Sequence, residues 1–166
     1  MERLWAPWRM SYILGEKVSR CIFCTSAAAS DDQESLVLYR DSNCFIMMNR
    51  FPYNNGHLMV APLRHVGNLE ELEDAEGLEL MQLLRLSIVV MRAELGPEGF
   101  NIGCNLGHTA GAGIVDHVHL HVVPRWNGDT NFMPVLSETK IINEALGQTY
   151  AKLKERFSSS RRYGAP

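Results

Sequence analysis

The chain has 166 residues and a formal net charge of −3, with 46% hydrophobic and 21% charged residues. This length and composition predict one globular domain spanning residues 1–166 and argue against a strongly basic surface, so we expect no nucleic-acid partner. No apolar run is long enough to cross a membrane, and residues 1–20 carry charges throughout, so we expect no membrane partner, no signal peptide and a cytoplasmic location.

The two ends of the chain are predicted to lie outside the compact body. Residues 1–20 contain Trp5, Trp8 and Arg9 without periodicity, which is typical of an extended arm that packs over the body or across a partner subunit. Residues 158–166 are rich in serine and arginine, and such a terminus is typically a flexible tail.

Cys21 and Cys24 form a Cys-x-x-Cys motif directly after the predicted arm. Such a pair can be a thioredoxin-like redox site, half of a tetrahedral zinc site, or two incidental cysteines. A redox site requires a helix after the motif, whereas residues 27–32 have a loop-like composition. The zinc interpretation is favoured because histidines elsewhere in the chain can supply two more ligands.

Short apolar runs predict an antiparallel meander. The runs at 36–39 and 44–48 are joined by a polar turn, and a third strand is predicted at 57–61, ending at Pro62. Alternation over residues 100–105 predicts a fourth strand.

Two segments have the spacing of amphipathic helices. Apolar residues recur every three or four positions after Asn68, where Gly77 is expected to divide a short helix from a longer one that stops at Gly96-Pro97. The same spacing predicts another helix over residues 137–157. Neither segment carries residues that suggest chemistry.

The segment from Leu106 to Gly113 is rich in glycine and alanine. Small residues allow backbone N–H groups to face an oxyanion, so this loop either holds phosphate or is an ordinary turn. Its position directly before a histidine-rich stretch favours phosphate.

That stretch runs from His117 to Arg125 and alternates three histidines with apolar residues. A period of two predicts a strand closed by Pro124, with all three imidazoles on one face. A solvated polar face is the alternative, but three alternating histidines favour a catalytic cleft. The expected fold class is therefore α+β, an antiparallel sheet of about five strands with packed helices.

The histidine-rich stretch resembles the signature of the histidine-triad (HIT) family of nucleotide-binding hydrolases and transferases. Further family-like blocks are Asn49 with His57 eight residues later, Pro62 with His65, and Asn105 with the glycine-rich loop. The opening Leu-Trp-Ala-Pro-Trp-Arg (4–9) and the segment Pro-Arg-Trp-Asn-Gly-Asp (124–129) resemble a bacterial branch, the diadenosine polyphosphate phosphorylases and related hydrolases.

The resemblance implies catalytic roles for three histidines. His119, the middle one, is the implied nucleophile, because a neutral imidazole is not repelled by phosphate oxygens and can form a nucleotidyl-histidine. His121 would hydrogen-bond the phosphate or assist the leaving oxygen, and His57 would support the pair electrostatically. Where some members have Ser or Thr before the triad this chain has Ile114, and His108 receives no role.

The resemblance also implies a set of nucleotide-binding residues: Asn49, Asn105, Gly111, Gly113, Ile22 and Phe23. Asn49 falls where the family has a ribose ligand, and Asn105 resembles a ligand on the phosphate side. Ile22 and Phe23 look like part of the purine wall, with simple core packing as the alternative.

The likeness extends to the galactose-1-phosphate uridylyltransferases, whose zinc ligands correspond to Cys21, Cys24, His65 and His117. This Cys₂His₂ set is typical of a closed structural site with no open position for water. The implied cofactor is therefore a structural zinc ion that fixes the histidine strand.

The implied function is cleavage of the α-phosphate linkage of a dinucleoside polyphosphate or a related nucleotide conjugate, with water or phosphate as the acceptor. Arg9 and Arg125 are candidates to hold that phosphate, although each can instead form a structural salt bridge. The alternatives are a nucleoside phosphoramidase, a uridylyltransferase, or a zinc-stabilised nucleotide-binding module with little turnover. Family members form dimers, so a homodimer is expected.

Overall fold

The computed structural model describes residues 21–130, 142 and 144–160. The predictions for residues 1–20, which include the extended arm and the role of Arg9, lie outside this part of the chain, as do those for residues 161–166.

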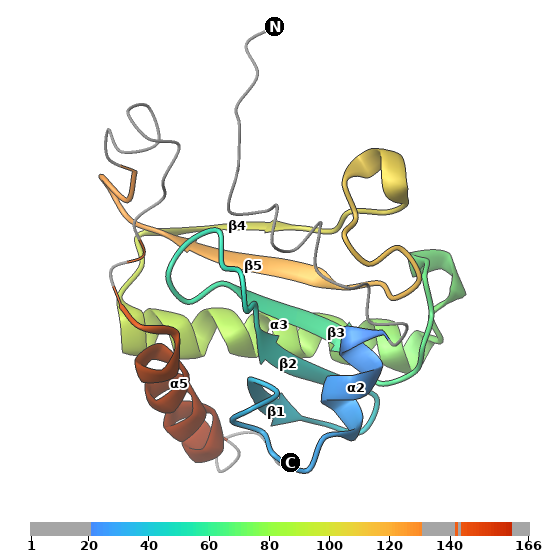
Figure 1. Ribbon diagram of the computed structural model, residues 1–166, viewed down its shortest axis with the longest axis horizontal. Coiled ribbons are helices and arrows are strands. Elements are labelled where there is room, and N and C mark those ends of the chain that lie inside the picture. Colours follow the sequence, from blue (N-terminus) through green and yellow to red (C-terminus); the bar gives the residue numbers. More distant parts are fainter. Residues whose placement is uncertain (1–20, 131–141, 143, 161–166) are drawn as a thin grey trace, which may run out of the picture.

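A single five-stranded sheet forms the centre of the described structure (Figure 1). Its strand order is β1-β2-β3-β5-β4, and every neighbouring pair is antiparallel. The strands are β1 Val37–Arg40, β2 Cys44–Met48, β3 Leu58–Pro62, β4 Gly99–Gly103 and β5 Leu120–Arg125. The α+β fold class is confirmed, and the first four strands lie close to their predicted positions.

Helices cover both faces of this sheet. The helices are α2 Ile22–Ala28, α3 Asp74–Leu95 and α5 Leu146–Ser160. Helices α3 and α5 share one core with strand residues such as Ile46 and Val60, whereas Phe23 of α2 shares a second core with Phe45 and Met59. Because successive strand side chains point to opposite faces, the same strands supply both cores, and α2 lies in front of the sheet in Figure 1 with α3 behind it.

Strand β5 differs from its predicted extent, because it begins at Leu120 rather than His117. The Val118 N–H donates to the Val66 carbonyl (2.7 Å), so the chain follows the loop after β3 before it joins the sheet. Pro124 lies inside the strand rather than closing it. It pairs with Phe100 of β4 beyond the last β3 pair, so its missing N–H removes no bond to β3.

Helix α3 is not divided at Gly77 as predicted. It begins instead at a capping box. The Glu73 side chain accepts the backbone N–H of Glu76, and the Glu76 side chain accepts the backbone N–H of Glu73. A separate 3₁₀ helix, Leu69–Glu71, precedes it. The predicted stop is confirmed, because Gly96 takes a left-handed conformation (φ 58°) that ends the helix.

Helix α5 is Leu146–Ser160, while residues 137–141 and 143 of the predicted helix lie outside the described residues. Glu144 lies just before the helix, where its carboxylate accepts a hydrogen bond from Thr149 Oγ1 (2.6 Å). Residues 158–160 are therefore helical rather than part of a tail, and Ser158 donates to the Lys154 carbonyl one turn earlier (2.8 Å).

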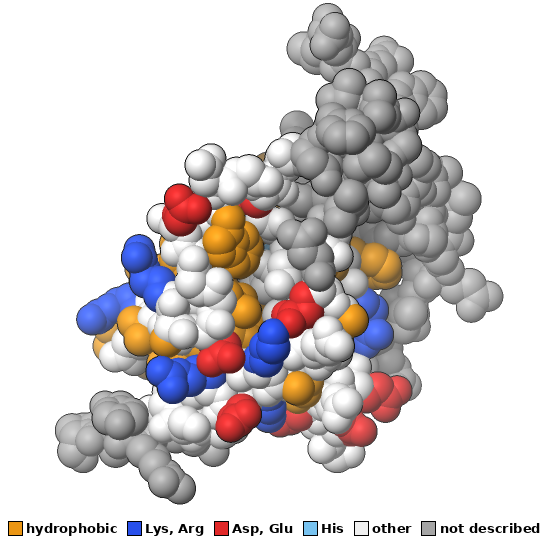
Figure 2. Space-filling model, turned by 90° about the vertical axis from the view of Figure 1, so that its left-hand side faces the viewer, with side chains coloured by type: hydrophobic (Ala, Val, Ile, Leu, Met, Phe, Trp, Pro, Cys, Tyr) orange, Lys and Arg blue, Asp and Glu red, His pale blue; other side chains and the backbone are white. Residues whose placement is uncertain are grey.

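The described helices include none that is long and apolar enough to cross a membrane. Figure 2 shows the side of the molecule on the left of Figure 1, where basic and acidic side chains are interspersed over the described surface. On this face the described residues form no continuous basic patch of the kind that binds nucleic acid.

Candidate active site

The register of the sheet decides which face the histidines predicted to be catalytic occupy. His121 of β5 lies directly opposite Met59 of β3, and Met59 belongs to the core on the α2 side. Leu120 lies opposite Val60, which belongs to the core on the α3 side. His119 precedes the strand, but its ring is in edge contact with His121 (centroids 4.8 Å apart), so both imidazoles lie on the α2 side.

The hydrogen bonds of His119 leave one ring nitrogen available for attack. Its Nδ1 lies 2.8 Å from the carbonyl oxygen of His117, which can only accept, so Nδ1 carries the proton and donates it. The lone pair of the neutral ring is therefore on Nε2. Burial lowers the pKa of His119, whose side chain is 5% exposed, and this favours the neutral form that a nucleophile requires.

Phe23 holds this ring from the side of helix α2. The two ring centroids are 4.5 Å apart, and the same phenyl ring lies 5.0 Å from His117. Phe23 is fully buried, whereas its neighbour Ile22 is 38% exposed. Of the two residues predicted to form the purine wall, Ile22 therefore has an accessible surface. Phe23 is packed in the core, which was the alternative to a role in binding.

A backbone donor determines which ring nitrogens carry the protons in a second histidine pair, His57 and His121. The Tyr53 N–H donates to Nδ1 of His57 (3.1 Å), so this nitrogen is the unprotonated one. His57 then carries its proton on Nε2 and donates it to Nδ1 of His121 (2.9 Å). As a result His121 carries its own proton on Nε2, where it is available as a donor to a substrate oxygen.

Burial and the neighbouring His119 lower the pKa of His121 to about 4. We therefore expect its ring to stay neutral between pH 5 and pH 8, and an NMR titration of the ring to show a midpoint well below the ordinary value of about 6.5. Between these two values the unfolded chain binds the additional proton, so the free energy of unfolding should fall as the pH is lowered through this window.

Urea unfolding at pH 7, 5.5 and 4.5 measures that loss. The matched control is His121→Gln, which keeps a donor and an acceptor but cannot titrate in this range. The variant should lose less stability on acidification than the parent protein. An equal loss in both proteins would contradict the low pKa of His121.

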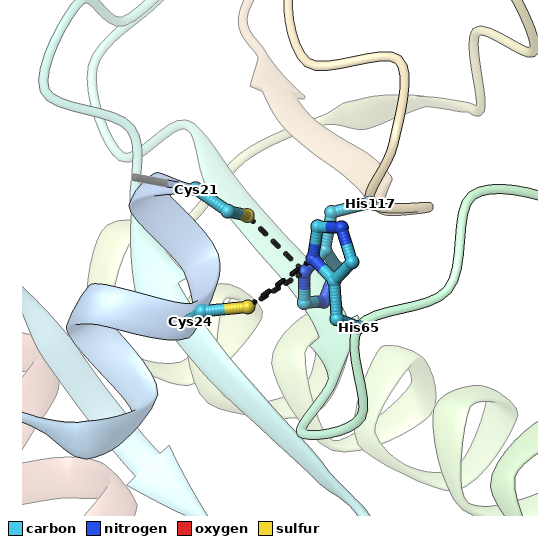
Figure 3. Close-up of side chains that lie close together, drawn as sticks. All are labelled: Cys21, Cys24, His65 and His117. Carbon is cyan, nitrogen blue, oxygen red and sulfur yellow. Dashed lines mark hydrogen bonds between the residues drawn. The ribbon is translucent and has the colours of Figure 1, made fainter. Parts of the chain in front are cut away.

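Four side chains that can bind a metal ion come together next to Phe23 (Figure 3). They are Cys21, Cys24, His65 and His117, whose ligand atoms all lie within 4.8 Å of one another. Cys21 Sγ lies 3.3 Å from Nδ1 of His117, and Cys24 Sγ lies 3.2 Å from Nδ1 of His65. Figure 3 shows both sulfur atoms and both rings directed toward a common centre.

The hydrogen bond on the far side of His117 supports a metal-binding role. Its Nε2 donates to the carbonyl oxygen of Pro62 (2.9 Å), which leaves the lone pair of Nδ1 directed at the two thiols. Two thiols and two imidazole nitrogens in one closed cluster fit zinc, which prefers four such ligands in a tetrahedral arrangement. The residues that the sequence predicted as a metal site are therefore brought together.

Helix α2, which begins directly after Cys21, replaces the loop that was expected in the first part of residues 27–32. Its first end has no side-chain cap, but its last end is held by Arg40 of β1. The Arg40 guanidinium donates to the carbonyl oxygens of Ser26 (2.9 Å) and Ala29 (3.1 Å). These bonds help to satisfy the carbonyl groups at the end of the helix, and they attach α2, which carries Cys24, to strand β1.

The residues 30–128 match the family described as the HIT domain. This chain belongs to the HIT family. The AP-4-A phosphorylase of Mycobacterium tuberculosis is 40% identical to this HIT protein over 157 residues, which are 90% of this chain and 80% of that relative.

Two further comparisons agree. The adenosine 5′-monophosphoramidase of Schizosaccharomyces pombe is 31% identical over 107 residues, which are 64% of this HIT protein and 75% of that relative. The crystal structure of a Zn-bound histidine triad family protein from Mycobacterium smegmatis matches its fold with a TM-score of 0.68 at 24% identity, covering 86% of this chain and 96% of that one. The predicted family and fold are confirmed.

The predicted nucleotide-binding residues Asn49 and Asn105 follow two different strands of the sheet. Asn49 follows β2, and its N–H donates to the carbonyl oxygen of His57 (2.9 Å). Asn105 follows β4 and approaches the carbonyl oxygen of Gly111 (3.5 Å), which ends the 3₁₀ helix His108–Ala110. Their binding roles, and that of Gly113 in the same loop, stay predictions.

A glycine of β4 lies beside His121. Gly103 of β4 lies directly opposite His121, and a Cβ atom placed on this glycine would meet nothing within 4 Å. Among the described residues, this glycine therefore leaves open the position next to His121 that a larger side chain would occupy.

Arg125, which follows the triad, was predicted either to hold phosphate or to form a structural salt bridge. The Arg125 guanidinium is bound to Asp129 through Nε (2.5 Å) and to Asn101 through one terminal nitrogen (2.7 Å), which is the structural salt bridge named as the alternative to phosphate binding. Sequence reasoning missed the role of Tyr53, because a backbone N–H is present in every residue except proline and gives no signal of its own.

Proposed function

We propose that this HIT protein cleaves the α-phosphate linkage of dinucleoside polyphosphates, with diadenosine tetraphosphate as the first candidate, through a nucleotidyl-His119 intermediate. The observation that carries this proposal is a pair of neighbouring imidazoles with centroids 4.8 Å apart: His119 has its lone pair on Nε2, and His121 has its proton on Nε2. The 40% identity to an AP-4-A phosphorylase over 157 residues supports this substrate class.

In the first step, Nε2 of His119 attacks the α-phosphorus, and the bond to the bridging oxygen breaks. The leaving polyphosphate needs no proton, because a terminal phosphate is a stable anion near neutral pH. His121 donates a hydrogen bond from Nε2 to the phosphate oxygens or the leaving oxygen. The phosphorylated His119 ring is a cation, and the His117 carbonyl oxygen stabilises its charge at Nδ1 (2.8 Å).

In the second step, an acceptor oxygen attacks the same phosphorus, and His119 leaves as neutral imidazole. With inorganic phosphate as the acceptor the product is a nucleoside diphosphate, and with water it is a nucleoside monophosphate. We propose phosphate, since the M. tuberculosis relative is named a phosphorylase.

We also propose that Cys21, Cys24, His65 and His117 hold one structural zinc ion. When bound, zinc would fix the position of His117 without offering an open coordination site for chemistry. His117 then supports catalysis through its backbone, because its carbonyl oxygen orients the ring of His119 (2.8 Å).

The identity of the acceptor can be tested by product analysis. At millimolar phosphate, diadenosine tetraphosphate should yield ADP and ATP, whereas a hydrolase would yield AMP and ATP whether or not phosphate is present. Chromatography of the products, with a phosphate-free reaction as the control, separates the two outcomes. AMP as the sole mononucleotide partner of ATP would contradict the phosphorylase proposal and leave a hydrolase.

A nucleoside phosphoramidase is the second candidate, supported by the 31% identity to the S. pombe monophosphoramidase over 107 residues. The same two histidines could release ammonia or an amine from an adenosine phosphoramidate. Comparing kcat/KM for a phosphoramidate and for diadenosine tetraphosphate decides between them. A nucleotide-binding module with little turnover would bind both substrates and cleave neither.

We expect the protein to act as a homodimer in the cytoplasm. Exposed apolar side chains on α3, such as Leu78 (63% exposed) and Val89 (64%), are available for subunit contacts. Sedimentation equilibrium tests the predicted dimer.

A further inference from the structure

The segment that follows β5 contains a buried carboxylate, Asp129, which forms an ion pair with an exposed arginine. The side chain of Asp129 is 7% exposed, whereas its partner Arg125 is 45% exposed. One oxygen, Oδ2, accepts from Arg125 Nε (2.5 Å) and from Asn54 Nδ2 (2.8 Å). The hydrogen bonds and positive charge of Arg125 hold the pKa of Asp129 far below its usual value, although burial alone would raise it, so the side chain is a carboxylate near neutral pH.

The contact with Asn54 connects this carboxylate to a loop on the catalytic side of the sheet. Asn54 is 5% exposed, and its Nδ2 group donates to Asp129 and also to the carbonyl oxygen of Pro124 (2.9 Å). Both of its amide protons are thereby used. The side chain of Asn54 is thus held at two points by the segment 124–129, although the two segments lie far apart in the sequence.

Backbone groups around Asn54 form hydrogen bonds with His57, which is in turn bonded to His121. The carbonyl oxygen of Asn54 accepts the N–H of His57 (3.2 Å), and the N–H of the preceding residue, Tyr53, donates to Nδ1 of His57 (3.1 Å). Gly56 closes this turn with a positive φ of 73°, and a Cβ there would lie 2.7 Å from the Leu95 side chain. Gly56 is therefore packed closely against Leu95, and the loop meets His57 through two hydrogen bonds.

We propose that Asp129 and Asn54 are positioning residues, which set the direction of the hydrogen bonds through His57 to His121. By holding the loop, they keep the Tyr53 N–H on Nδ1 of His57, which forces the proton of His57 onto Nε2 and the proton of His121 onto its own Nε2. The proposal rests on the proposed function for its catalytic consequence, since neither residue contacts the reacting atoms.

If the loop relaxes, His57 loses the donor that excludes a proton from Nδ1. Either tautomer of His57 then becomes accessible, and His121 is free to reverse its own proton. A reversed His121 would present the lone pair of Nε2 to the substrate in place of an N–H donor. This lone pair would repel the phosphate oxygens and slow the attack by His119. The predicted signature is therefore a mixed tautomer in the free protein and a lower kcat.

The experiment compares Asp129→Asn and Asn54→Ala with Glu98→Gln as the matched control. Glu98 accepts the N–H of Asn127 in the same segment (2.9 Å), so its variant removes one charge from the segment but leaves the contact between Asp129 and Asn54 intact. Thermal melts identify any variant that does not fold, and Asp129→Asn, which is nearly isosteric, carries the test if Asn54→Ala is unfolded.

The first readout is ¹⁵N NMR of the histidine ring nitrogens in the free protein, which requires no substrate. The parent protein and Glu98→Gln should show His57 and His121 protonated on Nε2 alone, whereas the two test variants should show both tautomers of His57. The second readout is steady-state kinetics, in which kcat should fall about 10- to 100-fold in the test variants with KM within about twofold of the parent value.

Unchanged tautomers in a folded Asp129→Asn variant would overturn the proposal, as would equal loss of kcat in Glu98→Gln. A mixed tautomer in the test variants supports it even if diadenosine tetraphosphate is not the substrate, because the NMR result is independent of turnover. Failure of the proposed function and failure of this inference are therefore distinguishable.

Discussion

Replacing His119 with alanine should abolish turnover while leaving nucleotide binding largely intact. The expected loss of kcat is at least about 10³-fold, because the variant removes the atom that forms the covalent bond and not a contact that binds substrate. His119 also packs against Phe23 (centroids 4.5 Å apart), so alanine leaves a cavity, which we expect to lower stability by about 1–3 kcal/mol.

A second variant separates chemistry from packing. His119→Asn retains a side-chain N–H near the position of Nδ1, so it can still donate to the His117 carbonyl oxygen, but it has no counterpart of Nε2. It should be as inactive as alanine and closer to the parent protein in thermal stability. His108→Ala, at an exposed position in the 3₁₀ helix, is the control and should keep full activity. Retention of about a tenth of the activity in either His119 variant would exclude it as the nucleophile.

Purified protein should contain about one zinc ion per chain, and Cys24→Ser or His65→Ala should lower both zinc content and thermal stability. A ligand that binds only the folded state at 100 times its Kd contributes about 2.7 kcal/mol, which corresponds to a change in Tm of about 5–10 °C for a chain of this size. Elemental analysis of protein purified without chelators, combined with thermal melts, measures both effects.

Cys104→Ser is the matched control for the metal prediction. Cys104 lies outside the Cys21, Cys24, His65 and His117 cluster, so its substitution should leave the zinc content unchanged. If the parent protein contains no metal, the Cys₂His₂ assignment is wrong, and Cys21 and Cys24 become a redox pair or incidental cysteines. Equal loss of zinc in Cys104→Ser would indicate general destabilisation and not the loss of a ligand.

The family and the residues of the candidate site could be predicted from the sequence because both depend on local patterns. Alternation of histidine with apolar residues is visible within nine positions, and it placed His119 and His121 on one face, as the contact between their rings shows. Cys21 is the N-cap of helix α2 and Cys24 lies in its first turn, so their three-residue spacing brings the two sulfur atoms to the same side.

The limits of strands and helices were harder to predict where tertiary contacts compete with local preference. The period of two extended to His117, but the hydrogen bond from Val118 to Val66 draws the first two histidines out of the strand. Gly77 was expected to interrupt α3, yet the helix continues through it, because the capping box at Glu73 fixes its start and packing against the sheet outweighs the cost of one glycine.

The sequence by itself determined which residue types are available for catalysis and metal binding, and in which order along the chain. Only the tertiary structure decided which nitrogen of each imidazole carries the proton. Those protons are set by the carbonyl oxygens of His117 and Pro62 and by the N–H of Tyr53. Backbone groups of this kind are the same in nearly every residue, so their effect depends on where the folded chain places them and leaves no trace in the local sequence.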